Sequence, residues 1–256
     1  MMHNLLRTEM YKLNRNRTFW GLLFFITSIS TFMHYLIVTD WWVMTSSPFE
    51  FVGLSDLNAL STFIVPLFFN VIISTLAGFF IATEFSGQSA IKNQIVSGHK
   101  RRNIFLAKYT VFTLGSIIVT IVIPLVTAII VSFIFGEADA FTIEKFDYLF
   151  QSYSLFTLQF LCFTAVVAII AIMTEDSGRT VIFTLLLSAL MFVIEKFVTK
   201  LWIKDLYEYT FFYQFTLAFQ PNLPMADIIK SIVIGSVSFI LLIVSGILLF
   251  QRKEIR

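Results

Sequence analysis

The sequence contains few charged residues. Lys, Arg, Asp and Glu account for 13% of its 256 residues, about half of the share that is typical of a soluble domain. This composition excludes a disordered chain and argues against an ordinary soluble enzyme. The formal net charge is +2, so the sequence also offers no basic surface for nucleic acid.

Cysteine and histidine are scarce as well. Cys162 is the only cysteine, so it cannot form an internal disulfide, and its apolar neighbours predict a packing role. The three histidines, His3, His34 and His99, lie far apart, and none has the i, i+4 partner of a helical zinc site. No metal site is therefore predicted. His34 lies in a long apolar run, where we expect a hydrogen-bonded interior or interfacial side chain.

A phosphate-binding loop is also absent, because no glycine in the sequence is followed by Lys-Ser or Lys-Thr. This chain is therefore not expected to hydrolyse ATP. No residue of it is predicted to be catalytic.

Apolar residues are abundant, at 57% of the chain, and 31 of them are phenylalanine. The phenylalanines reflect either an AT-rich genome or an aromatic lining. Six apolar runs approach or exceed the ~20 residues that an α-helix needs to cross a bilayer. Because they are continuous rather than alternating, they predict helices and not strands, and hence an all-α polytopic membrane protein. The runs are residues 18–38, 60–82, 104–135, 153–174, 180–194 and 228–250.

The basic residues are distributed unequally between the two sides that six spans define. Thirteen of the eighteen Lys and Arg residues, but only five of the sixteen acidic residues, fall on the side of the two termini. By the positive-inside rule, both termini are predicted to be cytoplasmic, in the cell membrane.

Two segments outside the spans are amphipathic. Near the start, Leu6, Met10 and Leu13 form an apolar stripe at helical spacing, which predicts a helix on the inner leaflet; a disordered basic tail is the alternative. Residues 197–219 are predicted to form an outer helical cap between the fifth and sixth spans. Its lysines either reach toward lipid headgroups or form a positive rim for an exported anionic group. The residues singled out in this cap are Lys196, Lys200, Trp202 and Lys204.

The segment between the second and third spans is predicted to carry the mechanism. Gly87 and Gly98 bracket about ten residues that are compatible with a short helix. Ile91 and Ile95 give this helix an apolar face suited to a soluble partner. An ordinary positive-inside loop is the alternative.

The same segment carries a motif in which a Glu precedes a Gly-Thr/Gln-x-x-x-Lys-Asn-like helix, followed by a Gly and an Arg-rich stretch. The matching positions are Glu84, Gly87, Gln88, Lys92, Asn93, Gly98, Arg101 and Arg102. The usual Thr is Gln88 here. On these residues the chain resembles the permeases of type-2 ABC exporters. Its end, from Phe250 to Ile255, is similar to the tail of many members.

This resemblance implies that residues 1–256 form a single transmembrane permease domain with an N-terminal elbow helix, six spans and an outer helical hairpin. It also implies a separate cytoplasmic ATPase subunit, which binds ATP and Mg, and a second permease copy or paralogue. The motif residues, with Ile91 and Ile95, are then the ATPase-subunit interface.

In size and composition the chain is similar to small Gram-positive permeases that export antimicrobial or cytolytic peptides, including the phenol-soluble-modulin exporters of staphylococci. The cargo expected is therefore an amphipathic peptide or a lipid-like molecule that enters from membrane lipid. Polar or aromatic positions within the spans either line a path or join helices by hydrogen bonds. They are Phe69, Asn70, Ser74, Thr157, Gln159 and Thr164.

Two other functions compete with this one. An ion-coupled transporter or channel needs ionisable groups at membrane depth, and the middle of each predicted span has none. An intramembrane enzyme of the prenyl-protease type needs paired glutamates and histidines on helices, whereas the adjacent acids here are Glu175 and Asp176 at a span end.

Overall fold

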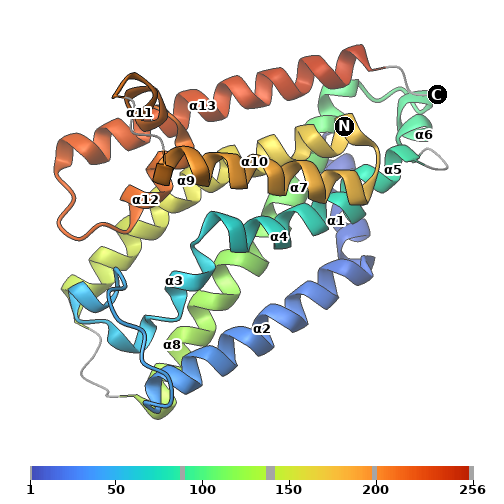
Figure 1. Ribbon diagram of the computed structural model, residues 1–256. Helices are drawn as coiled ribbons and strands as arrows, with labels where there is room; N and C mark the ends of the chain where they lie inside the picture. The colour runs from blue at the N-terminus through green and yellow to red at the C-terminus, as the bar shows by residue number, and fades with distance from the viewer. Residues whose placement is uncertain (1, 87–89, 137–141, 198–200, 254–256) are drawn as a thin grey trace.

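The computed structural model describes residues 2–86, 90–136, 142–197 and 201–253, and these residues fold as α-helices without strands (Figure 1). The longer helices are α1 (Met2–Arg15), α2 (Arg17–Val38), α4 (Pro66–Ala77), α7 (Arg101–Ile117), α8 (Ile123–Phe135), α9 (Ile143–Thr174), α10 (Ser177–Phe197) and α13 (Met225–Arg252). The shorter ones are α3 (Leu60–Phe63), α5 (Thr83–Ser86), α6 (Ala90–Val96), α11 (Leu201–Glu208), α12 (Phe211–Ala218) and the 3-10 turns η1 (Glu50–Val52) and η2 (Ser55–Leu57). Two π-helical turns continue the helices that precede them, η3 (Gly78–Ala82) and η4 (Ile118–Val122).

Six helical segments are long and apolar enough to cross a membrane, which confirms the six predicted spans. They are Arg17–Val38, Pro66–Phe85, Arg101–Phe135, Ile143–Thr174, Ser177–Phe197 and Met225–Arg252. The second span begins later than predicted, at Pro66, because proline has no backbone N–H and forces the preceding Val65 into an extended conformation. The fourth span begins earlier, because the charged turn at its start is also helical.

The spans pack side by side, with α2 along α8, α10 along α4, and α13 along α9. Both chain ends lie at the same end of the bundle (Figure 1). This end, called the terminal end below, also holds α1, α5 and α6, whereas α3, α11 and α12 lie toward the opposite end.

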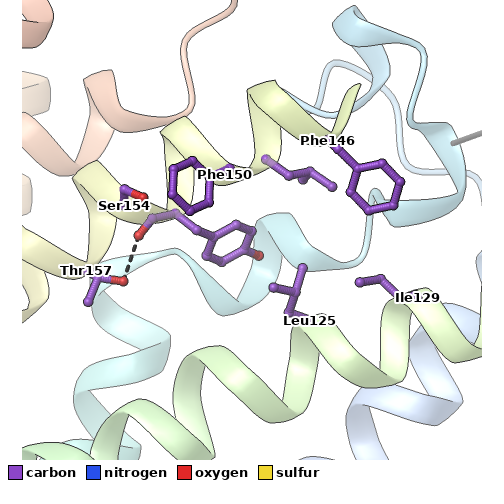
Figure 2. A pocket seen from close by; sticks show the side chains of 8 residues that line it. Leu125, Ile129, Phe146, Phe150, Ser154 and Thr157 are labelled. Carbon is purple, nitrogen blue, oxygen red and sulfur yellow. Dashed lines mark hydrogen bonds between the residues drawn. The ribbon is translucent and has the colours of Figure 1, made fainter. Parts of the chain in front are cut away.

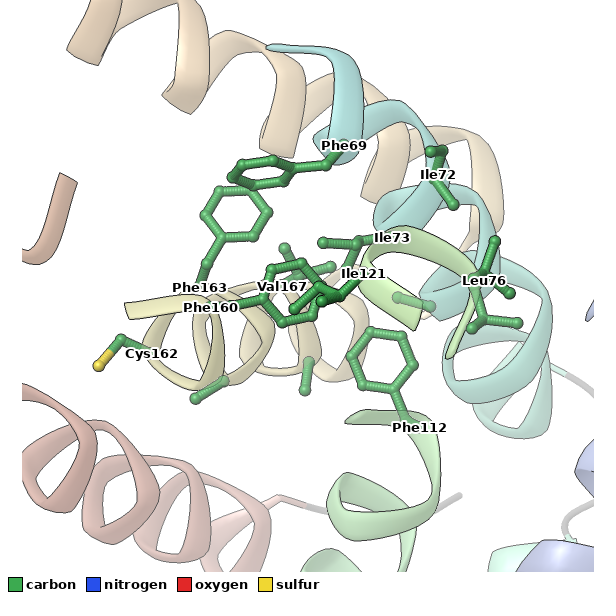
Figure 3. Close-up of a cluster of buried hydrophobic side chains, with 14 of the residues drawn as sticks. Phe69, Ile72, Ile73, Leu76, Phe112, Ile121, Phe160, Cys162, Phe163 and Val167 are labelled. Carbon is green, nitrogen blue, oxygen red and sulfur yellow. The ribbon is translucent and has the colours of Figure 1, made fainter. Parts of the chain in front are cut away.

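The core is built largely of phenylalanine rings. Phe156, Phe160 and Phe163 recur at helical spacing on one face of α9, and the ring of Phe69 from α4 lies edge-on to all three, at 5.7, 5.7 and 5.1 Å between centroids. Figure 3 shows Phe69 above Phe163. The ring of Phe215 on α12 lies 5.2 Å from Phe69. Much of the phenylalanine content therefore serves packing between helices.

Small residues allow α13 to approach α9 closely. A Cβ on Gly235 would lie 2.8 Å from the Gln159 Nε2, so a larger residue there would displace the side chains of α9. The Cys162 Sγ donates to the Gly235 carbonyl oxygen at 3.2 Å, and the Gln159 Nε2 donates to that of Ser231 at 3.1 Å. This contact confirms the packing role predicted for Cys162.

His34 is fully buried between α2 and α8, as an interior residue hydrogen-bonded within its own helix. Its Nδ1 lies 2.7 Å from the carbonyl oxygen of Ser30, and the Ser30 hydroxyl lies 2.6 Å from that of Thr127 on α8. The second of these bonds ties the first span to the third.

The segment between the fifth and sixth spans forms two eight-residue helices, α11 and α12, which agree with a cap and are too short to span. Trp202 and Lys204 on α11 are exposed, and the exposed Lys196 pairs with Glu195 at 2.8 Å. Lys200 lies outside the described residues.

Candidate functional site

Four charged side chains from three helices meet at the terminal end and form a closed ring of ion pairs. The Lys12 Nζ lies 2.9 Å from the Glu9 Oε1 and 3.0 Å from the Glu84 Oε1. The Lys108 Nζ lies 3.1 Å from the Glu9 Oε2 and contacts the Glu84 Oε2. Each carboxylate therefore uses one oxygen for each lysine. We call these four residues the charged junction.

Two residues of the charged junction are buried and two are partly exposed. The side chains of Glu9 and Lys108 are 1% and 3% exposed, and those of Glu84 and Lys12 are 15% and 27% exposed. A buried ion that loses its partner costs ~3–5 kcal/mol. Breaking one ion pair of the ring therefore weakens the others, and the helices that carry the four residues are expected to move together.

The two junction residues on α1 stay charged at neutral pH. Burial alone would raise the pKa of Glu9, but the ammonium groups of Lys108 and Lys12 outweigh it and hold that pKa below its usual value. Burial would likewise lower the pKa of Lys12, but Glu84 and Glu9 outweigh it and raise that pKa. Both shifts favour the ionised pair.

The buried face of α1 differs from the predicted one. Leu5, Glu9 and Leu13, at i, i+4 and i+8, point into the bundle, whereas Met10 is exposed. Of the stripe predicted from Leu6, Met10 and Leu13, Leu13 is buried and Leu6 packs against the core, but the centre of the buried face is Glu9 and not Met10, because its two lysine partners lie there. Leu13 packs closely against α7, since a Cβ on Gly115 would lie 3.0 Å from its Cδ2.

The short helix α6 is joined to the charged junction by one hydrogen bond. The Gln94 Nε2 donates to the Glu9 Oε1 at 2.8 Å. Gly98 ends this helix, as predicted, with a φ of 81° and an N–H that bonds to the Ile95 carbonyl at 2.9 Å. Only glycine adopts this backbone conformation without strain. Gly87 and Gln88 lie outside the described residues.

The face that α6 presents to solvent is not the predicted one. Ile91 is fully buried and Ile95 is partly buried against the core, so their apolar face packs on the chain itself. Lys92 and Asn93 are exposed, and Val96 is 80% exposed. Burying Ile91 and Ile95 removes apolar surface from water, and the neighbouring helices of the same chain provide the surface for it.

Other contacts extend from α1 to the first and second spans. The side-chain oxygen of Asn16 caps α2 by accepting from the Phe19 N–H at 3.1 Å. The Asn16 Nδ2 donates at 3.4 Å to the carbonyl oxygen of Phe79, which lies in the π-helical turn η3.

The two predicted interface arginines, Arg101 and Arg102, begin α7. Arg102 is exposed, whereas the Arg101 side chain donates a hydrogen bond to the backbone at the end of α13.

Five of the six candidate path residues are buried in contacts between helices. Asn70 donates to the carbonyl oxygen of Thr184 at 2.7 Å and to the hydroxyl of Ser188 at 2.8 Å, and so joins α4 to α10. The Thr164 hydroxyl lies 3.3 Å from that of Tyr109. Phe69, Ser74 and Gln159 are fully buried as well. Asn70, Gln159 and Thr164 thus join helices by hydrogen bonds, whereas Phe69 packs against other rings and Ser74 bonds within α4.

Thr157, the sixth candidate, is partly exposed and lines a groove. This groove, of about 520 Å³, runs between α8 and α9 and is mainly apolar (Figure 2). Phe146 and Phe150 form one wall and Leu125 and Ile129 the other, while the Thr157 hydroxyl bonds back to the Tyr153 carbonyl at 2.6 Å.

Residues 5–195, about three-quarters of the chain, match the family model described as ABC-2 family transporter protein. The chain belongs to this ABC-2 transporter family. The matched region contains the charged junction, α6, the first four spans and all but the last two residues of the fifth. A comparison with curated proteins finds no match.

Membership of the ABC-2 family makes this chain a multi-pass transmembrane permease subunit of an ABC transporter. The family implies a separate ABC ATPase as partner and a dimeric arrangement. Such permease subunits are generally not catalytic themselves.

The residues predicted for the site did not include Glu9, Lys12, Gln94 or Lys108. Lys108 stands in the apolar run of the third span, and an ionisable residue in such a run signals a paired partner. Glu9 lies four residues from Leu5 and from Leu13, so its place on their face was also readable. Gln94 carried no comparable signal.

Proposed function

We propose that residues 1–256 form the permease of an ATP-driven exporter and that its ATPase subunit docks on the exposed face of α6 at the cytoplasmic side of the cell membrane. The observation that carries this proposal is the two-sided placement of α6. One face offers Lys92, Asn93 and Val96 to a partner. The other packs Ile91 into the core and is joined through Gln94 to the charged junction.

The charged junction supplies a physical route for coupling. A displacement of α6 pulls on Glu9 through Gln94, and Glu9 is bound to Lys12 and Lys108. Because separating these charges in a buried site is costly, α1 and the adjoining ends of the second and third spans move as one unit. Asn16 carries the displacement on to α2.

Energy enters through the partner. The ATPase subunit binds ATP and Mg, and its nucleotide-bound form shifts the permease only through a different affinity for its two conformations. In a dimer of this chain, or of this chain with a paralogue, closure of two ATPase subunits draws the two α6 helices together. The basic residues on the terminal side of the spans support the cytoplasmic placement of α6.

The docking of the ATPase on α6 is tested by Val96→Asp. This side chain is exposed, so the permease should fold normally, but a carboxylate buried in the docking site would lack a partner. We expect capture of the ATPase subunit by the tagged permease to fall at least about tenfold, since ~1.4 kcal/mol corresponds to tenfold.

Phe51→Asp is the matched control, because Phe51 is similarly exposed but lies in η1, which joins the first span to the second, whereas α6 joins the second to the third. Its capture of the ATPase subunit should equal that of the wild type. Wild-type capture by Val96→Asp would refute docking on this face. Movement of cargo by the permease alone under a proton gradient would instead favour an ion-coupled transporter.

The cargo we propose is an amphipathic or hydrophobic molecule, with a cytolytic or antimicrobial peptide as the leading candidate. The groove between α8 and α9, with apolar walls and a few hydroxyls, supports cargo that reaches the protein through membrane lipid. Phe146 and Phe150 contribute aromatic surface to it (Figure 2).

The cargo assignment predicts ATP-dependent uptake of a fluorescein-labelled, ~20-residue amphipathic cytolytic peptide by inside-out vesicles that contain the permease and its ATPase. Thr157→Phe, which narrows the groove, should lower the uptake severalfold without changing capture of the ATPase subunit. Uptake that is equally fast without ATP, or no uptake by an assembled complex, would refute the peptide and leave the permease assignment intact.

A further inference from the structure

The end of α13 is fixed at the terminal end by a residue outside the charged junction. The Arg101 Nη1 donates to the backbone carbonyl oxygens of Gln251, at 2.9 Å, and of Lys253, at 2.6 Å. Carbonyl groups at the end of a helix have no partner within it. Arg101, the first residue of α7, therefore caps the sixth span.

The side chain of Lys253 makes a second set of contacts, with residues outside α7. Its Nζ lies 2.7 Å from the Glu175 Oε1 and also donates to the carbonyl oxygen of Ile172 at the end of α9. The same Nζ lies 5.1 Å from the centroid of the Phe85 ring. One side chain thus joins the end of the sixth span to the ends of the fourth and second spans.

Aromatic packing next to Lys253 also joins the end of the sixth span to the second and third spans. Phe250 is fully buried, with its ring 5.9 Å from that of Phe85 and 6.2 Å from that of Phe105. A Cβ on Gly246 would lie 2.9 Å from the Phe105 Cε2 and closer still to its Cζ, so any larger residue would push the ring aside.

The backbone conformation of Glu175 is unusual for a residue other than glycine. Glu175 ends α9 in the left-handed conformation, with a φ of 55°. Glycine is the usual residue at such a helix end, and a non-glycine residue held there points to a role for its side chain. The ion pair with Lys253 supplies that role.

The residues held by the end of α13 flank α6 on both sides, since Phe85 precedes α6 and Arg101 follows it. We propose that Lys253 and Arg101 are positioning residues for energy coupling, which attach α13 to both flanks of α6 and so transmit its displacement to the sixth span. This inference rests on the proposed docking of the ATPase at α6. The charged junction reaches α1 and the second and third spans, but not α13.

The test is hydrogen exchange of the complete permease–ATPase complex, with and without trapping by ATP and vanadate. In the wild type we expect protection of residues 90–97 when the ATPase subunit binds. We also expect at least a threefold change in the exchange rate of residues 246–252 on trapping. In Lys253→Ala the change at 246–252 should be lost while protection at 90–97 persists.

Three further variants separate coupling from folding. Arg252→Ala removes a neighbouring exposed charge and should behave as the wild type. Lys253→Arg keeps the charge and should restore the change at residues 246–252. Glu175→Gly favours the left-handed backbone yet removes the ion pair, so it should fold normally and still lose the change.

Each outcome decides between the two proposals. Protection at residues 90–97 without any trapping-dependent change at 246–252 overturns this inference and leaves the proposed function standing. A change at 246–252 that survives in Lys253→Ala also overturns it. Absence of protection at 90–97 overturns the docking of the ATPase on α6, and the inference with it.

Discussion

Replacing Glu9 with glutamine is expected to destabilise the permease by ~3–5 kcal/mol. Glutamine has nearly the same shape, so the loss is electrostatic. The buried Lys108 loses one of its two carboxylate partners, and Lys12 loses one as well. Thermal unfolding of the detergent-solubilised protein measures the effect, and coupling of ATP hydrolysis to transport should fall with it.

A double variant separates the ion pair from the packing at this position. Glu9→Gln combined with Lys108→Met removes both charges of one pair, so it should recover part of the stability that Glu9→Gln loses. Arg7→Gln, at an exposed position on the same helix, should leave the unfolding temperature unchanged. If Glu9→Gln unfolded at the wild-type temperature, the charged junction would have no energetic role.

Replacing Phe69 with alanine is expected to cost ~3–5 kcal/mol as well, by leaving a cavity in the aromatic core. The Phe69 ring is fully buried and contacts rings from both α9 and α12, so its loss leaves no side chain that can fill the space. The unfolding temperature and the yield of folded protein measure this loss.

Phe24→Ala is the control for Phe69→Ala, because the ring of Phe24 is 75% exposed on α2 and should contribute little to stability. The comparison also tests the role of Phe69. A stable Phe69→Ala variant with altered cargo preference would mean that this ring lines a path and does not primarily hold the core.

The six spans could be predicted from the sequence because each is a local property of one continuous apolar run. Span boundaries moved where local chemistry opposed the pattern, as at Pro66, or where a charged helical turn extended beyond the apolar residues, as at Ile143. The end of α6 at Gly98 was predictable for the same reason, since one glycine sets it.

The charged junction could not be predicted because its partners are distant in sequence. Glu9 and Lys108 are 99 residues apart, and Lys12 and Glu84 are 72 apart. The position of Lys108 in an apolar run and that of Glu9 between Leu5 and Leu13 indicate buried charges, but neither position identifies the partner, and only their meeting in space explains the ring. The burial of Ile91 could not be predicted for the same reason. Helical spacing identifies an apolar face, but it does not show whether the same chain or a partner covers that face.

The distance in sequence between Glu9 and Lys108 also sets the order in which the contacts of α1 form during synthesis. α1 is made first, but both of the buried lysine–glutamate links to later spans require segments that emerge after it. At ~5–20 residues per second, about 5–20 s pass between the synthesis of Glu9 and that of Lys108. Throughout that interval the nascent α1 keeps its acidic side chain hydrated at the membrane surface. The contacts of the N-terminal helix with the bundle are therefore complete only once the third span has been inserted, and a chain truncated before that span would lack the partner that Lys108 offers to Glu9.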